Sequence, residues 1–208
     1  MLKLYFSPGA CSLASHIGLE ESGAPYEIEP VLLAKKQQQT PEYLKINPRG
    51  KVPTLSIDGK SLVENTAILT YIARKFPDKK LLPADESDAA RCIATMCWFS
   101  SIVHPSYQRT RRPERFAADP AAHESIKENG KKSFMDNCRE IDKMIQGHEW
   151  VMGNQYTVVD PYALVFYGWG LNSDFPMHEL KNYTAWRERM LKRPAVKKSI
   201  EMEEKAAG

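Results

Sequence analysis

Residues 2–14 read LKLYFSPGACSLA, and the predicted fold depends on this stretch. Apolar residues alternate with other residues from Leu2 to Phe6, which predicts a β-strand. Ser7-Pro8-Gly9 interrupts the strand, and a helical pattern begins at Ala10. The sequence therefore predicts that a short strand gives way directly to a helix at the start of the chain.

Cys11 lies at the expected N-terminus of this helix. Unpaired N–H groups and the positive end of the helix dipole both favour a thiolate there, so we expect the pKa of the thiol to fall below ~8.5. The same N–H groups can bind an anionic sulfur of a ligand. The alternative interpretation is a small buried hydrophobic residue, because free cysteines often have that role.

The next sixty residues continue the alternation of strands and helices. Gly23 is expected to end the first helix, and Asp58-Gly59 is typical of a hairpin turn. We expect further strands at residues 26–33, 52–57 and 60–63, and a helix at residues 64–76. A strand–helix–strand crossover predicts a parallel pair of strands, to which the hairpin adds antiparallel strands.

The pattern changes to helix after Pro83. The segment from Pro77 to Pro83 is expected to be a linker, and the apolar positions after it have helical spacing. Thr157-Val158-Val159-Asp160 has the form of a capping box ahead of an apolar helix, so we assign Thr157 and Asp160 to folding. The predicted organisation is an α/β domain over residues 1–77, a linker over 78–84 and an all-α domain over 85–208.

Composition excludes several classes of function. The formal net charge of +3 is too small to imply a nucleic-acid partner or a membrane surface. We find no apolar run near the ~20 residues of a membrane span, and no signal-peptide pattern. The 4 cysteines lack metal-ligand spacing, so we expect no metal site. Free thiols point to a reducing compartment, and we expect the cytoplasm.

Four motifs together resemble the cytosolic glutathione transferases, over essentially the whole chain. They are the loop and proline strand at residues 47–55, the pair Glu64-Asn65, the capping signature from Gly153 to Asp160, and residues 7–13, which resemble the bacterial beta class in particular. The resemblance implies a thioredoxin-like N-terminal domain joined to an all-α C-terminal domain. It also implies a homodimer that conjugates glutathione, its co-substrate, to small hydrophobic electrophiles without any other cofactor.

The resemblance also assigns residues to glutathione binding. With a cis bond before Pro53, the backbone of Val52 can pair with the extended glutathione peptide. Glu64 is expected to bind its α-amino group, and Asn65 with the first-turn N–H groups the neighbouring carboxylate. Lys36, rather than Lys35, is assigned to the glycine carboxylate. A trans proline on an edge strand and a helix cap are the structural alternatives for these residues.

Three residues are candidates for activating the glutathione sulfur: Cys11, Ser12 and Tyr5. Cys11 stands where beta-class proteins place a cysteine that binds glutathione and can form a mixed disulfide, so thiol–disulfide exchange is an additional hypothesis. Ser12 offers a hydroxyl beside it, and Tyr5 lies near the strand end where many animal classes place a tyrosine. Ser100-Ser101 stands in place of the beta-class His-Lys pair, which is a departure from that class.

The electrophile pocket is expected between the two domains, a preferred place for ligands. The residues assigned to it are Phe6, His104, Tyr107 and Trp169. The arginines from Arg109 to Arg115 either recognise an anionic co-substrate or form a solvated face. Two other functions stay open: a non-catalytic binding protein for glutathione or apolar ligands, and a dedicated glutathione-dependent disulfide reductase or dehalogenase.

Overall fold

In the computed structural model, which describes residues 1–207, four strands form a sheet in the order β2-β1-β3-β4. The strands are β1 (Leu2–Phe6), β2 (Tyr26–Pro30), β3 (Thr54–Ile57) and β4 (Lys60–Val63). β1 pairs parallel with β2 and antiparallel with β3, and β3 pairs antiparallel with β4. The predicted parallel pair with an added hairpin is confirmed.

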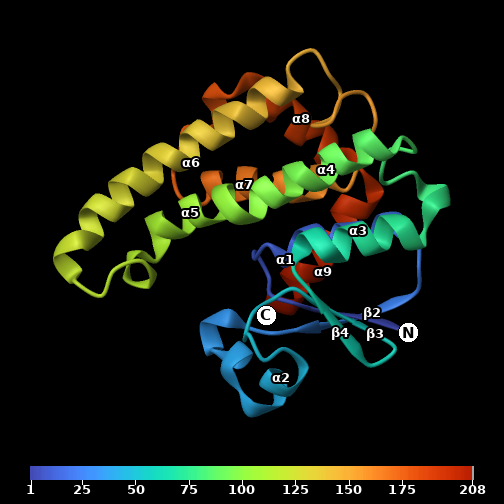
Figure 1. Ribbon diagram of the computed structural model, residues 1–208, viewed down its shortest axis with the longest axis horizontal. Helices are drawn as coiled ribbons and strands as arrows, with labels where there is room; N and C mark the ends of the chain where they lie inside the picture. The colour runs from blue at the N-terminus through green and yellow to red at the C-terminus, as the bar shows by residue number, and fades with distance from the viewer. Residues whose placement is uncertain (208) are drawn as a thin grey trace.

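Three helices belong to this sheet layer. α1 (Ser12–Ser22) crosses from β1 to β2 and packs beside α3 (Asn65–Lys75) on the face that meets the helical part, while α2 (Pro41–Ile46) lies on the other side (Figure 1). Gly23 ends α1 with φ 66°, in the left-handed region that glycine adopts without a Cβ penalty. The predicted helix stop is therefore confirmed.

The second strand is shorter than predicted. It ends at Pro30, and two 3₁₀ turns follow, η1 (Leu33–Lys35) and η2 (Gln37–Gln39). The Gln37 side chain accepts a hydrogen bond from the Leu32 N–H at 2.8 Å, which fixes this turn. The Val31 N–H still donates to the Phe6 carbonyl of β1 at 2.7 Å, but β1 ends at Phe6. The N–H groups of Leu32 and Leu33 therefore bond to the side chains of Gln37 and Ser7 instead of to a neighbouring strand.

The remainder of the described chain is mostly helical. Its helices are α4 (Glu86–Trp98), α5 (His104–Arg111), α6 (His123–Ile145), α7 (Val159–Leu171), α8 (Lys181–Lys192) and α9 (Pro194–Ala207). Shorter turns are η3 (Pro77–Lys79), the π-helical η4 (Phe99–Val103), η5 (Pro113–Arg115), η6 (Pro120–Ala122) and η7 (Met177–Glu179). α5 and α6 pack together into an arm that overhangs one side of the sheet layer (Figure 1). No helix within residues 1–207 is both long enough and apolar enough to cross a membrane.

Asp160 is fully buried at the start of α7, where it accepts four hydrogen bonds. Its Oδ2 accepts from the Thr157 N–H at 2.8 Å and the Thr157 hydroxyl at 3.4 Å. Its Oδ1 accepts from the Val151 N–H and the Trp186 Nε1–H, both at 3.0 Å. Burial raises the pKa of this carboxyl to about 6, against the opposing effect of its donors. These contacts join the turn, α7 and α8, which supports the assignment of Thr157 and Asp160 to folding.

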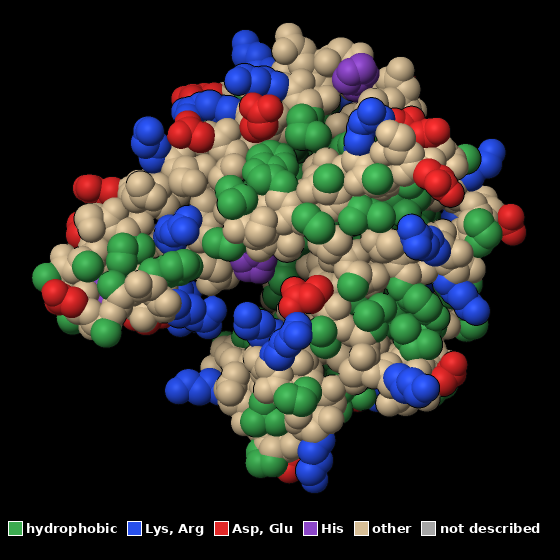
Figure 2. Space-filling model, viewed as in Figure 1, with side chains coloured by type: hydrophobic (Ala, Val, Ile, Leu, Met, Phe, Trp, Pro, Cys, Tyr) green, Lys and Arg blue, Asp and Glu red, His purple; other side chains and the backbone are tan. Residues whose placement is uncertain are grey.

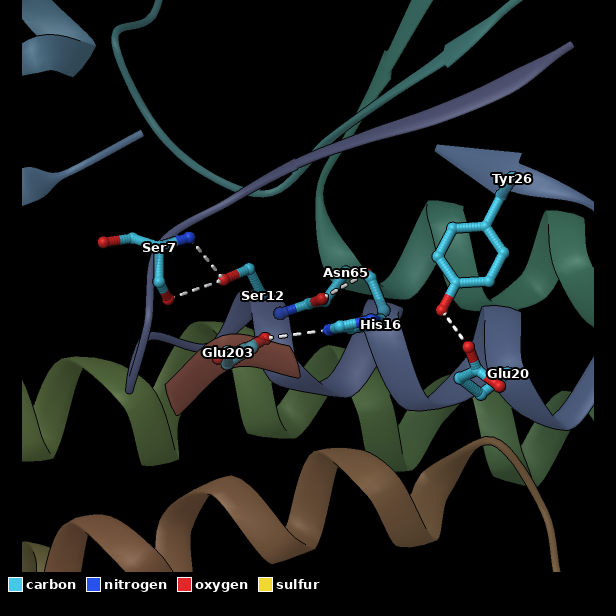
Figure 3. A network of polar contacts seen from close by, with 8 residues as sticks. Ser7, Ser12, His16, Glu20, Tyr26, Asn65 and Glu203 are labelled. Carbon is cyan, nitrogen blue, oxygen red and sulfur yellow. Dashed lines mark hydrogen bonds and ion pairs between the residues drawn. The ribbon is translucent and has the colours of Figure 1, made fainter. Parts of the chain in front are cut away.

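The turn between β1 and α1 is held from the helical part. Trp169 of α7 donates its Nε1–H to the Gly9 carbonyl at 2.9 Å. Glu203 of α9 reaches His16 of α1 at 3.2 Å, and both side chains are buried (Figure 3). Arg193 makes two hydrogen bonds to Glu21, at 2.7 and 3.0 Å. The position of Cys11 therefore depends on segments more than 150 residues later in the chain.

Candidate active site

A cavity of about 670 Å³ lies between the sheet layer and the helical part. Its floor comes from the β1–α1 turn, the loop before β3 and the start of α3, with Cys11, Val52 and Glu64 among its residues. Its roof comes from α5, η5 and α7, with His104 and Trp169 among its residues. Figure 2 shows the molecule hollowed between these two parts, with Lys and Arg side chains along both edges of the hollow.

Cys11 precedes the first residue of α1, and its side chain is only 8% exposed. Its thiol donates to the Val52 carbonyl at a sulfur–oxygen distance of 3.8 Å. Burial raises the pKa of this thiol to about 12, although the Cys11 backbone N–H favours the thiolate. The prediction of a lowered pKa is therefore wrong, because loss of solvent outweighs the helix N-terminus. The floor of the cavity carries a neutral thiol.

The loop before β3 presents Val52 to the cavity. The Val52–Pro53 bond is cis, as expected. The loop is anchored by Tyr43 and Asn47, whose side chains both donate to the Lys51 carbonyl at 2.7 Å. No acceptor for the Val52 N–H is found within residues 1–207, and the Val52 carbonyl receives the Cys11 thiol as a weak donor. The Val52 backbone can therefore pair with an extended ligand.

Glu64 precedes the first residue of α3 with φ 72°, a backbone region that residues with a Cβ rarely adopt. Its carboxylate lies 3.1 Å from Arg49, and both side chains are more than half exposed. Ile68 is the first residue of α3 whose N–H reaches a backbone carbonyl, that of Glu64 at 2.9 Å. Of the N–H groups ahead of it, that of Asn65 belongs to a residue that lines the cavity, beside the Glu64 carboxylate.

The sheet layer is similar in sequence to a known family. Residues 1–74 match the family model described as glutathione S-transferase, N-terminal domain. The chain is also 31% identical over 206 residues to glutathione S-transferase GST-4.5 of Xanthomonas campestris pv. campestris, covering 97% of this chain and 98% of that protein. The chain belongs to the glutathione S-transferase family. The family expected from the sequence motifs is confirmed.

Solved structures of glutathione transferases have the same fold. A homologue from Sulfitobacter with bound glutathione matches with a TM-score of 0.91 at 29% identity, over 99% of this chain and 98% of that one. A beta-class glutathione S-transferase of Sphingomonas chungbukensis matches with a TM-score of 0.85 at 33% identity, over 97% and 98%. The predicted thioredoxin-like sheet layer with a mostly helical C-terminal part is confirmed.

Two of the predicted catalytic residues lie outside the transferase cavity. The Ser12 side chain is fully buried, and its hydroxyl donates to the Ser7 carbonyl at 3.2 Å and accepts from the Ser7 N–H at 3.1 Å (Figure 3). Tyr5 packs edge-on against Tyr43, in a small cluster separate from the main core. Ser12 therefore closes the strand–helix turn, and neither residue can reach a substrate in the cavity.

Phe6 is also not a cavity residue. Its ring is fully buried against His16 in the main core. Successive side chains of a strand point to opposite faces, so Phe6 faces α1 while Tyr5 faces away from it. The prediction of both residues as site residues is wrong, because neither face of β1 opens into the cavity.

Asn65 lies at the cavity, but its side chain is already hydrogen-bonded. The amide Nδ2 donates to the Cys11 carbonyl at 2.9 Å, and Oδ1 accepts from the Ser15 hydroxyl at 2.6 Å. Both ends of the amide thus join α3 to the start of α1, and Figure 3 shows Asn65 beside that helix. These bonds use one of the two Nδ2 hydrogens, so the second one and the backbone N–H are the donors left for a carboxylate, and the predicted role of Asn65 stays a prediction.

The predicted lysine is not among the cations that line the cavity. Lys36 is exposed at the turn between η1 and η2 and does not line the cavity, and neither does Lys35. Arg49 and Lys51 of the loop before β3 line it instead. Sequence reasoning missed both, although they belong to the 47–55 motif, because a loop cation gives no signal of the direction in which its side chain points.

The roof of the cavity is aromatic. His104 lies edge-on to Trp169 with ring centroids 4.8 Å apart, and the Gln108 amide donates to its Nε2 at 3.2 Å. Tyr107 does not line the cavity; it stacks behind Trp169 at 4.6 Å and hydrogen-bonds Ser173. The assignment of Tyr107 to the pocket is therefore wrong, and its role is to support Trp169.

Tyr162 is a cavity residue that the sequence did not reveal. It lines the cavity from α7, although only 2% of its surface is exposed. It lies in a helix that is buried on nearly all sides, so periodicity marks every residue of that helix as core. No pattern in the sequence separates the one tyrosine that reaches the cavity from its buried neighbours.

The His104 imidazole should stay neutral at pH values well below the usual pKa of a histidine. Burial lowers its pKa to about 4, and the positive charges of Lys51 and Arg115 act in the same direction. Because the folded pKa lies below the unfolded value of ~6.5, this group's contribution to stability is present above pH ~6.5 and is lost as the pH falls toward 4.

We expect NMR titration to show one imidazole that remains unprotonated at pH ~5.5, with a midpoint near 4. The His104→Gln variant should lack that resonance and lose less stability than the wild type over the same pH range. A midpoint near ~6.5 for the resonance that disappears in the variant would contradict this prediction.

Proposed function

We propose that this glutathione transferase binds reduced glutathione extended along Val52 and Pro53 and joins its thiol to a small electrophile under Trp169 and His104. The observation that carries the proposal is the Val52 backbone, whose N–H lacks a partner within residues 1–207 and whose carbonyl holds only a thiol donor. The named relatives and the related structure with bound glutathione support a glutathione transferase. Glutathione is the co-substrate, and no other cofactor is needed.

Charged groups at the floor suit the two ends of glutathione. The Glu64 carboxylate is proposed to bind the α-ammonium group, and the Asn65 N–H at the start of α3 the adjacent carboxylate. Lys51 takes the role that the sequence suggested for Lys36, since it lines the cavity and pairs with no acid within residues 1–207. Arg49 holds Glu64 in place from the side.

The sulfur of glutathione is proposed to lie beside Cys11. The Cys11 N–H and the neutral Cys11 thiol are both hydrogen-bond donors there, at the positive end of α1. Hydrogen-bond donors that are in position before glutathione binds stabilise its thiolate form, and the proton of the glutathione thiol passes to solvent. The sulfur then forms a bond to the electrophilic carbon as the bond to the leaving group breaks. In this mechanism Cys11 donates a hydrogen bond and does not act as a nucleophile.

The test is conjugation of glutathione to 1-chloro-2,4-dinitrobenzene by the wild type and by Cys11→Ala. We expect the variant to keep its rate to within about tenfold, because one neutral hydrogen bond contributes ~1 kcal/mol and a tenfold change in rate needs ~1.4 kcal/mol. The control is Cys97→Ala, which removes an exposed thiol. Near-complete loss of the conjugation rate in Cys11→Ala but not in the control would show that Cys11 takes part in the reaction. A wild type that binds glutathione without conjugating it would favour a binding protein.

We further propose a homodimer in the cytoplasm. The family resemblance implies the dimer, and Ile102 of η4 is a large apolar side chain that is 49% exposed in the single chain. Four free thiols suit a reducing compartment. Light scattering should give twice the mass of the 23.7 kDa chain, and a mass equal to one chain would contradict the dimer.

A further inference from the structure

We propose that the electrophile carries a carboxylate, which Arg112 and Arg115 bind at the roof of the cavity. The inference rests on the proposed function and narrows its substrate class from hydrophobic to anionic electrophiles. The arginine run had two interpretations from sequence, an anion site or a solvated face. The structure divides the run: Arg112 and Arg115 line the cavity, whereas Arg111 lines a separate shallow groove with Lys131 and Asp174.

The charges that line the cavity exceed what glutathione requires. Four cations line it, Arg49, Lys51, Arg112 and Arg115, against one acid, Glu64. Glutathione has two carboxylates and one ammonium group. Glu64, the start of α3 and Lys51 are enough to bind these three groups, and Arg49 is paired with Glu64. The two arginines of the roof are therefore left for a second anion.

The two arginines have no strong partner of their own. Arg112 lies 3.9 Å from Glu114, with both side chains more than half exposed, and such a pair contributes little. Arg115 makes no ion pair within residues 1–207. An incoming carboxylate would have to displace only this long, exposed pair of Arg112 and none of Arg115, so both guanidinium groups are available for bidentate binding.

The backbone that carries these arginines is well fixed. Pro113 is buried, and the turn closes through Arg115 N–H to the Arg112 carbonyl at 3.0 Å and Phe116 N–H to the Pro113 carbonyl at 2.9 Å. η5 also packs against α6. The arginines are therefore presented from a folded turn rather than from a free loop, which lowers the entropy lost on binding.

The surroundings indicate an aromatic or apolar body beside the anion. Phe116 follows η5, lines the same cavity and is 42% exposed, with the Arg109 guanidinium over its ring at 5.2 Å. Trp169 and His104 form the neighbouring part of the roof. The charges of Lys51 and Arg115 both lower the pKa of His104, so the positive potentials of the floor cation and the roof cation overlap at His104. An aryl carboxylate matches both the rings and the charge.

The experiment compares 4-chloro-3,5-dinitrobenzoate with its uncharged amide as electrophiles for glutathione. We expect Arg112→Gln and Arg115→Gln each to raise KM for the benzoate about tenfold, as loss of a charge-assisted bond of ~1.5 kcal/mol implies. KM for the amide should change less than about twofold, because its polar group is neutral. Arg111→Gln is the matched control, since it removes the same charge outside the cavity.

The outcomes separate this inference from the proposed function. Equal changes for benzoate and amide, or an equal effect of Arg111→Gln, would overturn the anion site while the transferase activity stands. A wild type that conjugates the amide but not the benzoate would also overturn it. A wild type that conjugates neither compound, while remaining folded, would instead count against the proposed function.

Discussion

Replacing Asp160 with alanine is expected to lower the free energy of unfolding by about 4 kcal/mol or more, which approaches the whole stability of many domains. The carboxylate accepts hydrogen bonds from the N–H groups of Val151 and Thr157 and from Trp186, all within 3.0 Å. Alanine would leave three buried donors without a partner, and each such donor costs ~1–3 kcal/mol. Urea unfolding followed by circular dichroism measures the loss.

Two variants sharpen this prediction. Asp160→Asn keeps the oxygen that accepts from Val151 and Trp186 but turns an NH₂ group toward the Thr157 N–H, so its loss should be intermediate. Asp136→Ala removes an exposed carboxylate on α6 and should change stability by less than about 1 kcal/mol. If Asp160→Ala were no more harmful than Asp136→Ala, Asp160 would not be the residue that holds α7 and α8 together.

Replacing Glu64 with glycine is expected to weaken glutathione binding tenfold to hundredfold while raising stability by about 1 kcal/mol. Within residues 1–207 the carboxylate is the only acid that lines the cavity, so its loss leaves the ammonium group of glutathione unpaired. The backbone at Glu64 has φ 72° and ψ 125°, a conformation that glycine adopts without steric cost. Calorimetric titration measures the binding, and urea unfolding measures the stability.

The glutamine variant separates the two effects. Glu64→Gln keeps the Cβ and the same backbone but loses the charge, so it should bind glutathione weakly with unchanged stability. Glu42→Gln, an exposed change on α2 outside the cavity, should affect neither quantity. Glutathione binding that survives in Glu64→Gly would contradict the role of this carboxylate, whatever the stability of the variant.

The elements that were predicted well are those with local signals. Alternation marks β1, Gly23 ends α1, and Asp58-Gly59 turns the hairpin between β3 and β4. These signals work because backbone preferences and side-chain periodicity act within a few residues of one another. The prediction that the second strand continues past Pro30 was wrong because the residues near it do not indicate where the neighbouring strand ends. β1 ends at Phe6, so β2 has no strand to pair with beyond Pro30.

The errors at the site have a different cause. Ser12 adjoins Cys11 in sequence yet turns inward to bind Ser7, and Tyr5 and Phe6 face opposite sides of a sheet that does not open into the cavity. Proximity along the chain therefore did not indicate proximity to a substrate. The choice of Lys36 has a similar cause, because a loop residue has no periodicity from which the direction of its side chain can be predicted.

Local sequence was enough for the order of the elements, the capping residues at the start of α7 and the motifs of the family. The character of the site came from contacts between distant segments. Cys11 is protonated because Val52 and the helical part bury it, and the basic roof exists because η5 folds over a floor more than 45 residues earlier in the chain. Burial and electrostatic potential are sums over neighbours in space, so no stretch of sequence contains them.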